Sequence, residues 1–276
     1  MILGREAAIR DYDNNFLLNW EKIMSEYKRE DNKLWLAGPS SYVFSLNGTK
    51  FAVDLQIRRE SDLEALRDSL DSDLSDISFV LITHQHGDHM CVPLINALKD
   101  ADIKWFIPEG TRADYMERSG LSEDKIVRTK PGGKYNVNGI EINAFFTPHA
   151  VGEQPFLQCG YRISDGKKNV IIPGDIRDYD YCDYPKSSNI DLCVSHLWAG
   201  KDSMTPDKYM PMLEKFCKTS ASFGAKRYFL CHLYEIGREE SSLWRYVHAG
   251  IAMDMLYSLR PESIVEIPRL GESYNI

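Results

Sequence analysis

The heptapeptide Thr83-His84-Gln85-His86-Gly87-Asp88-His89 decides how this chain of 276 residues is interpreted. Its histidines and aspartate fall within six residues, and neutral imidazoles and carboxylates are preferred ligands of zinc-like cations. Gly87 lets the backbone turn sharply, so His84 and His86 can face one ion while Asp88 and His89 face another. A structural zinc site more often uses thiolates and leaves no open position, so this pattern indicates a catalytic metal site.

The residues around the motif predict an α/β fold. Ile77 to Thr83 form a continuous apolar run, typical of a buried strand, that leads directly into the motif. Asn47-Gly48 is a strong hairpin signal between two β-rich runs, 42–46 and 50–54. Further strands are predicted at 104–107, 140–146, 160–163, 169–172, 190–194 and 227–231. Strands that alternate with helical or polar segments favour an α/β sandwich.

Four helices are predicted from apolar spacing and helix-start signals. An amphipathic helix should span 9–27, and the form of a capping box at 61–64 indicates the start of a second helix. Thr205-Pro206 resembles a third start, although Pro211 should delay or kink that helix. A final helix should run from about 242 to 259, before Pro261.

Composition narrows the functional classes. The net charge of −8, with 33 basic and 41 acidic residues, argues against nucleic acid as a partner, because phosphate binding needs clustered Lys and Arg. The six cysteines contain no C-x-x-C pair and indicate reduced, mostly buried thiols. The chain has no apolar run of membrane-spanning length and no leader pattern, so we expect a cytoplasmic protein with no membrane partner.

The motif resembles the H-x-H-x-D-H signature of the metallo-β-lactamase superfamily. That family also requires a later His, an Asp at a strand end and a last His after another strand. Thr147-Pro-His149, Ile171-Ile-Pro-Gly-Asp175 and Phe229-Leu-Cys-His232 fill these positions. The resemblance extends over about residues 34–235.

This resemblance implies the fold, the cofactors and the site. The fold would be a four-layer αβ/βα sandwich. The cofactors would be two divalent metal ions, zinc or manganese with iron as an alternative, and a bridging water or hydroxide would be the nucleophile. The implied ligands are His84, His86 and His149 for the first metal, Asp88, His89 and His232 for the second, and Asp175 between them.

Several residues have a functional and a structural interpretation. Asp88 is the implied catalytic residue, since it can orient the hydroxide or relay its proton. Asp54, at the end of a strand, either orients a ligand histidine or caps a turn. His196, also at a strand end, either contacts substrate or has a structural role, whereas His248 in the last helix should be structural.

A second set of candidates lies in loops. Arg177, Tyr179 and Tyr181 follow Asp175 closely, and they either meet an anionic or sugar-like substrate or form a solvated loop. Trp198 and Lys201 carry the same two interpretations.

The expected reaction is hydrolysis of an ester-type bond, a lactone or a phosphoester, in a small and anionic substrate. The chain is most similar to the L-ascorbate-6-phosphate lactonase-like branch, and His86 stands where flavodiiron-type relatives have Glu, which disfavours a redox di-iron centre. A phosphodiesterase, a mononuclear iron persulfide dioxygenase-like enzyme and a non-catalytic metal-binding regulatory protein are the alternatives. We expect one domain over 1–276, with an N-terminal helix at about 6–30, a C-terminal helical extension at about 236–276, and homo-oligomers as one option.

Overall fold

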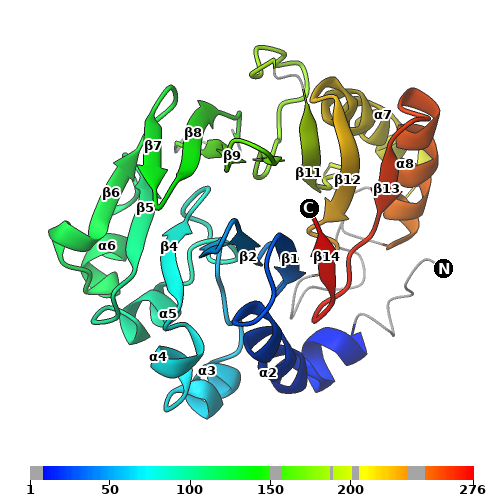
Figure 1. The fold of residues 1–276 in the computed structure, drawn as a ribbon. Coiled ribbons are helices and arrows are strands. Elements are labelled where there is room, and N and C mark those ends of the chain that lie inside the picture. Colours follow the sequence, from blue (N-terminus) through cyan, green and yellow to red (C-terminus); the bar gives the residue numbers. More distant parts are fainter. Residues whose placement is uncertain (1–8, 150–156, 187–188, 201–204, 235–245) are drawn as a thin grey trace.

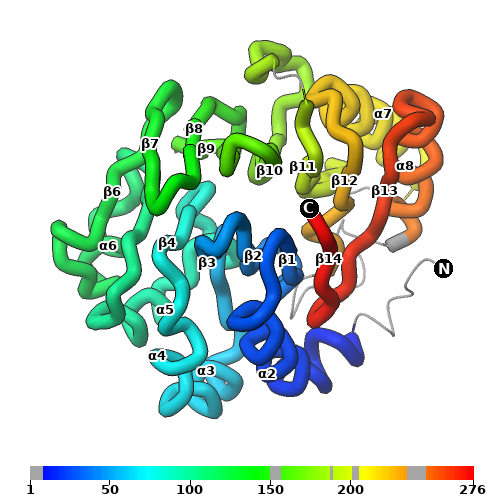
Figure 2. The backbone as a smooth tube through the Cα atoms, viewed as in Figure 1, coloured from blue at the N-terminus to red at the C-terminus, as the bar shows by residue number. Residues whose placement is uncertain are grey.

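The structure is a computed structural model that describes residues 9–149, 157–186, 189–200, 205–234 and 246–276. Two seven-stranded sheets lie face to face, and helices cover the outer side of each (Figures 1 and 2). None of the helices in these ranges has the length and apolar character needed to cross a bilayer.

The first sheet contains the strands from the N-terminal half of the chain and one strand from the C-terminal end. Its order is β14-β1-β2-β3-β4-β5-β6. Pairing is antiparallel from β14 to β3 and parallel from β3 to β6. The strands are β1 (Lys33–Leu36), β2 (Tyr42–Leu46), β3 (Thr49–Val53), β4 (Ile77–Leu81), β5 (Lys104–Pro108), β6 (Ile126–Thr129) and β14 (Ser273–Asn275).

The second sheet has the order β13-β12-β11-β10-β9-β8-β7. Here β13 to β10 are parallel and β10 to β7 are antiparallel, which mirrors the first sheet. The strands are β7 (Lys134–Val137), β8 (Ile140–Phe146), β9 (Cys159–Ser164), β10 (Asn169–Ile172), β11 (Ile190–His196), β12 (Ala225–Cys231) and β13 (Ile264–Glu266). All the strands expected from the sequence are present.

Helices flank the sheets on both outer faces (Figure 1). Those on the first sheet are the π-helical turn η1 (Arg10–Asn14), α2 (Phe16–Tyr27), α3 (Glu60–Leu66), α4 (Leu70–Asp73), α5 (Val92–Ala97), α6 (Ala113–Ser119) and the 3-10 turn η2 (Glu123–Lys125). Those on the second sheet are α7 (Pro206–Ser222) and α8 (Tyr246–Leu259). These layers confirm the expected αβ/βα sandwich.

The central strands have two buried faces, and alternation along each strand divides its side chains between them. In β2, Val43 packs with the cluster beneath α2, while Phe44 packs between the sheets. Phe51 and Phe79 join Phe44 between the sheets. This two-sided burial explains why the β4 segment of the sequence is an uninterrupted apolar run.

The C-terminal segment differs from the helical extension predicted for about 236–276. After α8, the short strand β13 pairs in parallel with β12, and β14 pairs antiparallel with β1 in the other sheet. Each contains three residues, which is too short for periodicity to reveal a strand. The predicted start of the last helix at 242 lies outside the described residues, whereas its end at Leu259 is as predicted.

Two predictions about helix starts have different outcomes. The capping box at 61–64 is wrong, because α3 begins at Glu60 with Arg59 as its N-cap. Arg59 instead forms an ion pair with Asp62, 2.6 Å away, which anchors the first turn. The helix start at Thr205-Pro206 is confirmed, and α7 continues through Pro211.

The aromatic stack between the sheets gives a test of the core. The Phe51 ring lies 4.9 Å from that of Phe44 and 4.7 Å from that of Phe79, and all three side chains are fully buried. We expect Phe51→Ala to lower the free energy of unfolding by about 3–5 kcal/mol, because it removes buried area and leaves a cavity. Leu18→Ala, at a position 67% exposed, should change it by less than about 0.5 kcal/mol. If urea denaturation gave the same change in unfolding free energy for both variants, the aromatic stack would not be a major contribution to stability.

Candidate metal centre

The seven predicted ligands converge at one edge of the two sheets, where strands end. They are His84, His86, Asp88 and His89 after β4, His149 after β8, Asp175 after β10 and His232 after β12. Parallel strands direct their carboxyl ends to the same edge, which is where α/β sheets bind ligands. Two backbone hydrogen bonds join the sheets there, from Cys159 N–H to the Thr83 carbonyl at 3.0 Å and from His232 N–H to the Pro39 carbonyl at 2.8 Å.

One group of candidate ligands consists of His84, His86 and His149. Their nearest nitrogen atoms all lie within 4.8 Å of one another, and His84 Nε2 is 3.1 Å from His86 Nδ1. Burial lowers the pKa of His84 and of His86, and it lowers the pKa of His149 to about 3. The three imidazoles are therefore neutral, the form in which histidine binds a metal.

A second group consists of Asp88, His89 and His232. Asp88 Oδ2 is 3.1 Å from His232 Nε2 and 3.7 Å from His89 Nε2. Two ligand atoms that are each about 2.1 Å from one tetrahedral ion lie roughly 3.4 Å apart. Both separations are close to that value, so this group fits a single cation.

Asp175 lies between the two groups. Its carboxylate oxygens are 3.5 Å from His89 Nε2, 3.9 Å from His149 Nε2 and 3.9 Å from His232 Nε2. Burial alone would raise the pKa of Asp175, but His232, Arg177 and His89 hold it well below its usual range. An ionised carboxylate therefore contacts histidines of both groups.

The His89 ring provides a test of whether these residues fit a metal. Its Nε2 is buried and has no hydrogen-bond partner among the described residues. The carboxylates of Asp88 and Asp175 lie 3.7 and 3.5 Å from that nitrogen, too far for a hydrogen bond but suitable for ligands of a common ion. A buried ring nitrogen left without a partner is costly, and a cation at this point would bind it with the ring in its neutral form. The donor set therefore fits a divalent metal.

Asp54 holds the other side of the His89 ring. Its Oδ2 is 2.7 Å from His89 Nδ1, and its carboxylate accepts hydrogen bonds from the backbone N–H and the hydroxyl of Thr83, each at 2.7 Å. Burial alone would lower the pKa of His89, but Asp175, Asp54 and Asp88 raise it to about 9. Asp54 thus fixes the orientation of the ring and also the strand end before the motif, as partners of ligand histidines do in metal sites.

Two of these residues have left-handed backbone conformations. Asp54 has φ of 49° and His232 has φ of 66°, and both directly follow a strand. This conformation is uncommon for residues other than glycine and persists only where the surrounding structure enforces it. The sharp turn directs each side chain across the end of its sheet toward the ligand groups.

His196 lies beneath Asp175, and its side chain is fully buried. Its Nδ1 is 3.0 Å from Asp175 Oδ1, and its Nε2 is 2.8 Å from the Tyr42 hydroxyl. Because the ionised carboxylate can only accept, Nδ1 donates to Asp175 and Nε2 accepts from Tyr42. Both ring nitrogens are engaged, which favours a supporting role for His196 over contact with substrate.

The candidate residues in the loops after β10 and β11 have different surroundings. Arg177 Nη2 donates to Asp175 Oδ2 at 2.6 Å, and its guanidinium lies 4.8 Å from the centre of the Trp198 ring. Tyr179 donates to the Trp198 carbonyl, and Tyr181 donates to the backbone of its own loop. Arg177 is therefore tied to the cluster while the two tyrosines support the loop.

Two predicted residues remain to be placed. Lys201 lies outside the described residues. His248 is buried in α8 with its ring 4.5 Å from that of Tyr209, away from the cluster, which agrees with the structural role expected for it.

Four supporting residues were not identified from the sequence. Gln158 donates to the Thr147 hydroxyl and to the Asp175 carbonyl, at 2.8 and 2.9 Å, and so joins two ligand loops. The Ser40 hydroxyl donates to the Asp88 carbonyl at 2.5 Å, and Arg58 Nη1 donates to the Gly87 carbonyl at 2.7 Å. The Tyr42 hydroxyl donates to His196 Nε2 at 2.8 Å. These are single polar residues on separate segments, and nothing in their local sequence distinguishes them.

Residues 53–233 match the profile of a family described as "Beta-lactamase superfamily domain". A lactamase-like protein of Aspergillus niger, adaB, is 30% identical over 157 residues, which make up 56% of this chain and 44% of that protein. The chain thus matches less than half the length of that relative.

Solved structures share the architecture. The diiron beta-hydroxylase CmlA from Streptomyces venezuelae aligns with a TM-score of 0.64 at 14% identity, over 90% of this chain and 54% of that one. Zn(2+)-bound PqqB from Methylobacterium extorquens aligns with a TM-score of 0.53 at 11% identity, over 86% of this chain and 87% of that one. At such low identity these similarities show the fold alone.

The contact between Asp54 and His89 gives a prediction about metal affinity. Asp54→Asn keeps the size of the side chain and tolerates the left-handed backbone, but it removes the charge. We expect a loss of about 10- to 100-fold in affinity for a divalent ion, measured by competition with a chelating dye. Asp76→Asn, on the exposed surface, serves as the control and should bind metal as the unmodified protein does. Unchanged affinity in Asp54→Asn would rule out this orienting role.

Proposed function

Because this chain belongs to the beta-lactamase superfamily, whose members are mostly metal-dependent hydrolases, we propose that it hydrolyses an ester-type bond with two divalent metal ions. The observation that carries the proposal is the pair of three-residue ligand groups that meet at Asp175. His84, His86 and His149 would hold one ion and Asp88, His89 and His232 the other. Asp175 would contact both.

The proposed metals are zinc or manganese, with iron as an alternative. Imidazole and carboxylate donors suit all three ions, so the donor set does not select one. Structural neighbours carry different metals, since CmlA is a diiron protein and PqqB was crystallised with zinc. Elemental analysis is therefore part of the experiment below.

Two bound cations would lower the pKa of a water molecule and polarise the substrate oxygen. Asp88 is suited to receive the proton, because its side chain is 13% exposed while that of Asp175 is 2% exposed. Burial alone would raise the pKa of Asp88, but His89 and His232 hold it well below its usual range. The carboxylate is thus ionised at neutral pH, which is the form that can accept a proton.

An anionic substrate is supported by the charges around the centre. The four positive charges of two divalent ions would exceed the three negative charges of Asp54, Asp88 and Asp175, and Arg177 adds a further positive charge. A centre with excess positive charge attracts a carboxylate or phosphate group. We propose a small lactone or phosphoester as substrate, in line with the resemblance to the L-ascorbate-6-phosphate lactonase-like branch. The organisation as one domain over 1–276 and the option of a homo-oligomer remain predictions from the sequence.

Metal content and a substrate panel test this proposal. We expect about two divalent ions per chain by elemental analysis, because two complete ligand groups are present. The zinc- and manganese-loaded proteins should then hydrolyse at least one class among lactones, phosphodiesters and thioesters. One iron per chain together with oxygen uptake would indicate the dioxygenase alternative instead. A protein that binds no metal after reconstitution would refute the proposal.

The role of Asp88 has its own test. Asp88→Asn keeps the volume of the side chain but removes the charge that accepts a proton. We expect turnover to fall by on the order of 10² or more while circular dichroism shows an intact fold. Asp114→Asn, on an exposed helix, provides the control. Turnover within about twofold of the unmodified protein would exclude Asp88 as the base.

A further inference from the structure

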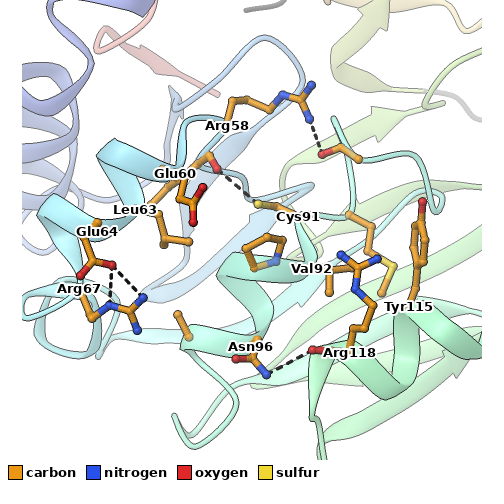
Figure 3. Close-up of a pocket in the computed structure, with 15 residues that line it drawn as sticks. Arg58, Glu60, Leu63, Glu64, Arg67, Cys91, Val92, Asn96, Tyr115 and Arg118 are labelled. Atoms are coloured by element: carbon orange, nitrogen blue, oxygen red, sulfur yellow. Dashed lines mark hydrogen bonds and ion pairs between the residues drawn. The ribbon is translucent and has the colours of Figure 1, made fainter.

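A cavity of about 530 Å³ lies on the helical side of the first sheet (Figure 3). Helices α3, α5 and α6 contribute its walls together with Gly87 of the ligand loop, which we define as residues 84–89. The volume falls within the roughly 300–1,000 Å³ of small-molecule sites. None of the seven candidate metal ligands lines the cavity, so it is distinct from the metal centre.

The floor of the cavity is apolar. Leu63, Met90 and Val92 line it and belong to the buried cluster beneath the helices. Tyr115 adds an aromatic ring from α6. A floor of this kind favours an aliphatic or aromatic group, since contact removes apolar surface from water.

Charged side chains surround this floor. Arg58, Arg67 and Arg118 line the cavity together with Glu60 and Glu64. Arg67 and Glu64 lie 2.9 Å apart and are both well exposed, so they compensate each other. The lining therefore has one more positive than negative charge, on a chain whose net charge is −8. This local reversal favours an anionic ligand over a cationic one.

Arg118 is the residue best placed to recognise that ligand. Its guanidinium carbon is 5.8 Å from the centre of the Tyr115 ring, and Figure 3 shows the side chain extending from α6. Within the part of the chain that the structure describes, no carboxylate forms an ion pair with it. A planar guanidinium above an apolar floor can bind a carboxylate or phosphate through two parallel hydrogen bonds.

Arg58 connects the cavity to the metal centre. It lines the cavity, and its Nη1 donates to the Gly87 carbonyl at 2.7 Å, which Figure 3 shows as a dashed line. Gly87 lies between two candidate ligands, His86 and Asp88. An anion in the cavity would attract the same guanidinium and so alter its hold on the ligand loop.

We propose that this cavity binds a small organic anion, a carboxylate or phosphate on an apolar body, through Arg118. The proposal goes beyond the hydrolytic function and does not depend on it. Phenylacetate and phenyl phosphate carry the two anionic groups, and phenylacetamide is the neutral isostere of the former.

The proposal is tested by titrating the metal-loaded protein with each of these three probes. Binding is monitored through the NMR signals of the protein. We expect one of the anions to bind with a dissociation constant on the order of 1 mM, at least about 10-fold tighter than phenylacetamide. The tighter anion identifies the preferred group. Equal affinity for anion and amide, or no binding of either anion, would overturn the proposal.

Two arginine variants locate the site. Arg118→Ala should weaken the anion by about 10-fold or more. Arg112→Ala is the matched control, because Arg112 lies 4.9 Å from the same Tyr115 ring but does not line the cavity. It should bind as the unmodified protein does. An anion that binds Arg118→Ala with unchanged affinity occupies another place, the metal centre included, and refutes the assignment.

A separate measurement tests whether Arg58 couples the cavity to the metal centre. This coupling rests on the proposed metal centre. Titration of zinc with and without phenylacetate should show a severalfold change in zinc affinity that is absent in Arg118→Ala, because coupling between two sites is reciprocal. Anion binding without this change would refute the connection and leave the cavity site intact. A failure to bind zinc would count against the proposed function, and the same probe titrations on the metal-free protein would then decide the cavity site.

Discussion

The burial of carboxyl groups beside imidazoles is the constraint on which the rest of the structure depends. Asp54 and Asp175 are almost completely buried, and an isolated charge in such a place is very unfavourable. In this chain His89 lies between them, 2.7 Å from Asp54 and 3.5 Å from Asp175. The arrangement leaves His89 Nε2 directed at oxygens too distant to bond with it, and a divalent cation is the group that satisfies all of them.

The two sheets hold these groups rigidly because each contributes strand ends to the same edge. Parallel pairing of β3 with β4, and of β11 with both β10 and β12, aligns the carboxyl ends that carry the ligands. Backbone hydrogen bonds at Thr83 and at His232 then join the sheets at that edge. The left-handed residues Asp54 and His232 occur where strands must end abruptly, which is where strain is expected at a functional site.

Support of the ligand loop extends outward from the metal centre. The Ser40 hydroxyl holds the Asp88 carbonyl, and Gln56 donates to Ser40 at 2.9 Å. Arg58 holds the Gly87 carbonyl from the side of the helical cavity. The loop is thus held from two directions by hydrogen bonds to its own backbone carbonyls. Its histidine and aspartate side chains therefore remain available for coordination. Changes in the cavity and changes at the metal centre therefore act on the same short segment.

The sequence by itself determined the α/β fold class, nine of the fourteen strands that the structure describes and the ligand motif at 84–89. It could do so because apolar runs and the spacing of His and Asp in 84–89 are local signals, whereas His149, Asp175 and His232 were expected as ligands only through the family resemblance. The two edge strands after α8 depend on tertiary pairing and were not predicted. The start of α3 was also predicted wrongly, because the local pair of Arg59 and Asp62 was not recognised. The surroundings of His196 were decided only by the tertiary structure. Its partners Tyr42 and Asp175 are 154 and 21 residues away in the chain, and a contact over such separations leaves no mark on local sequence.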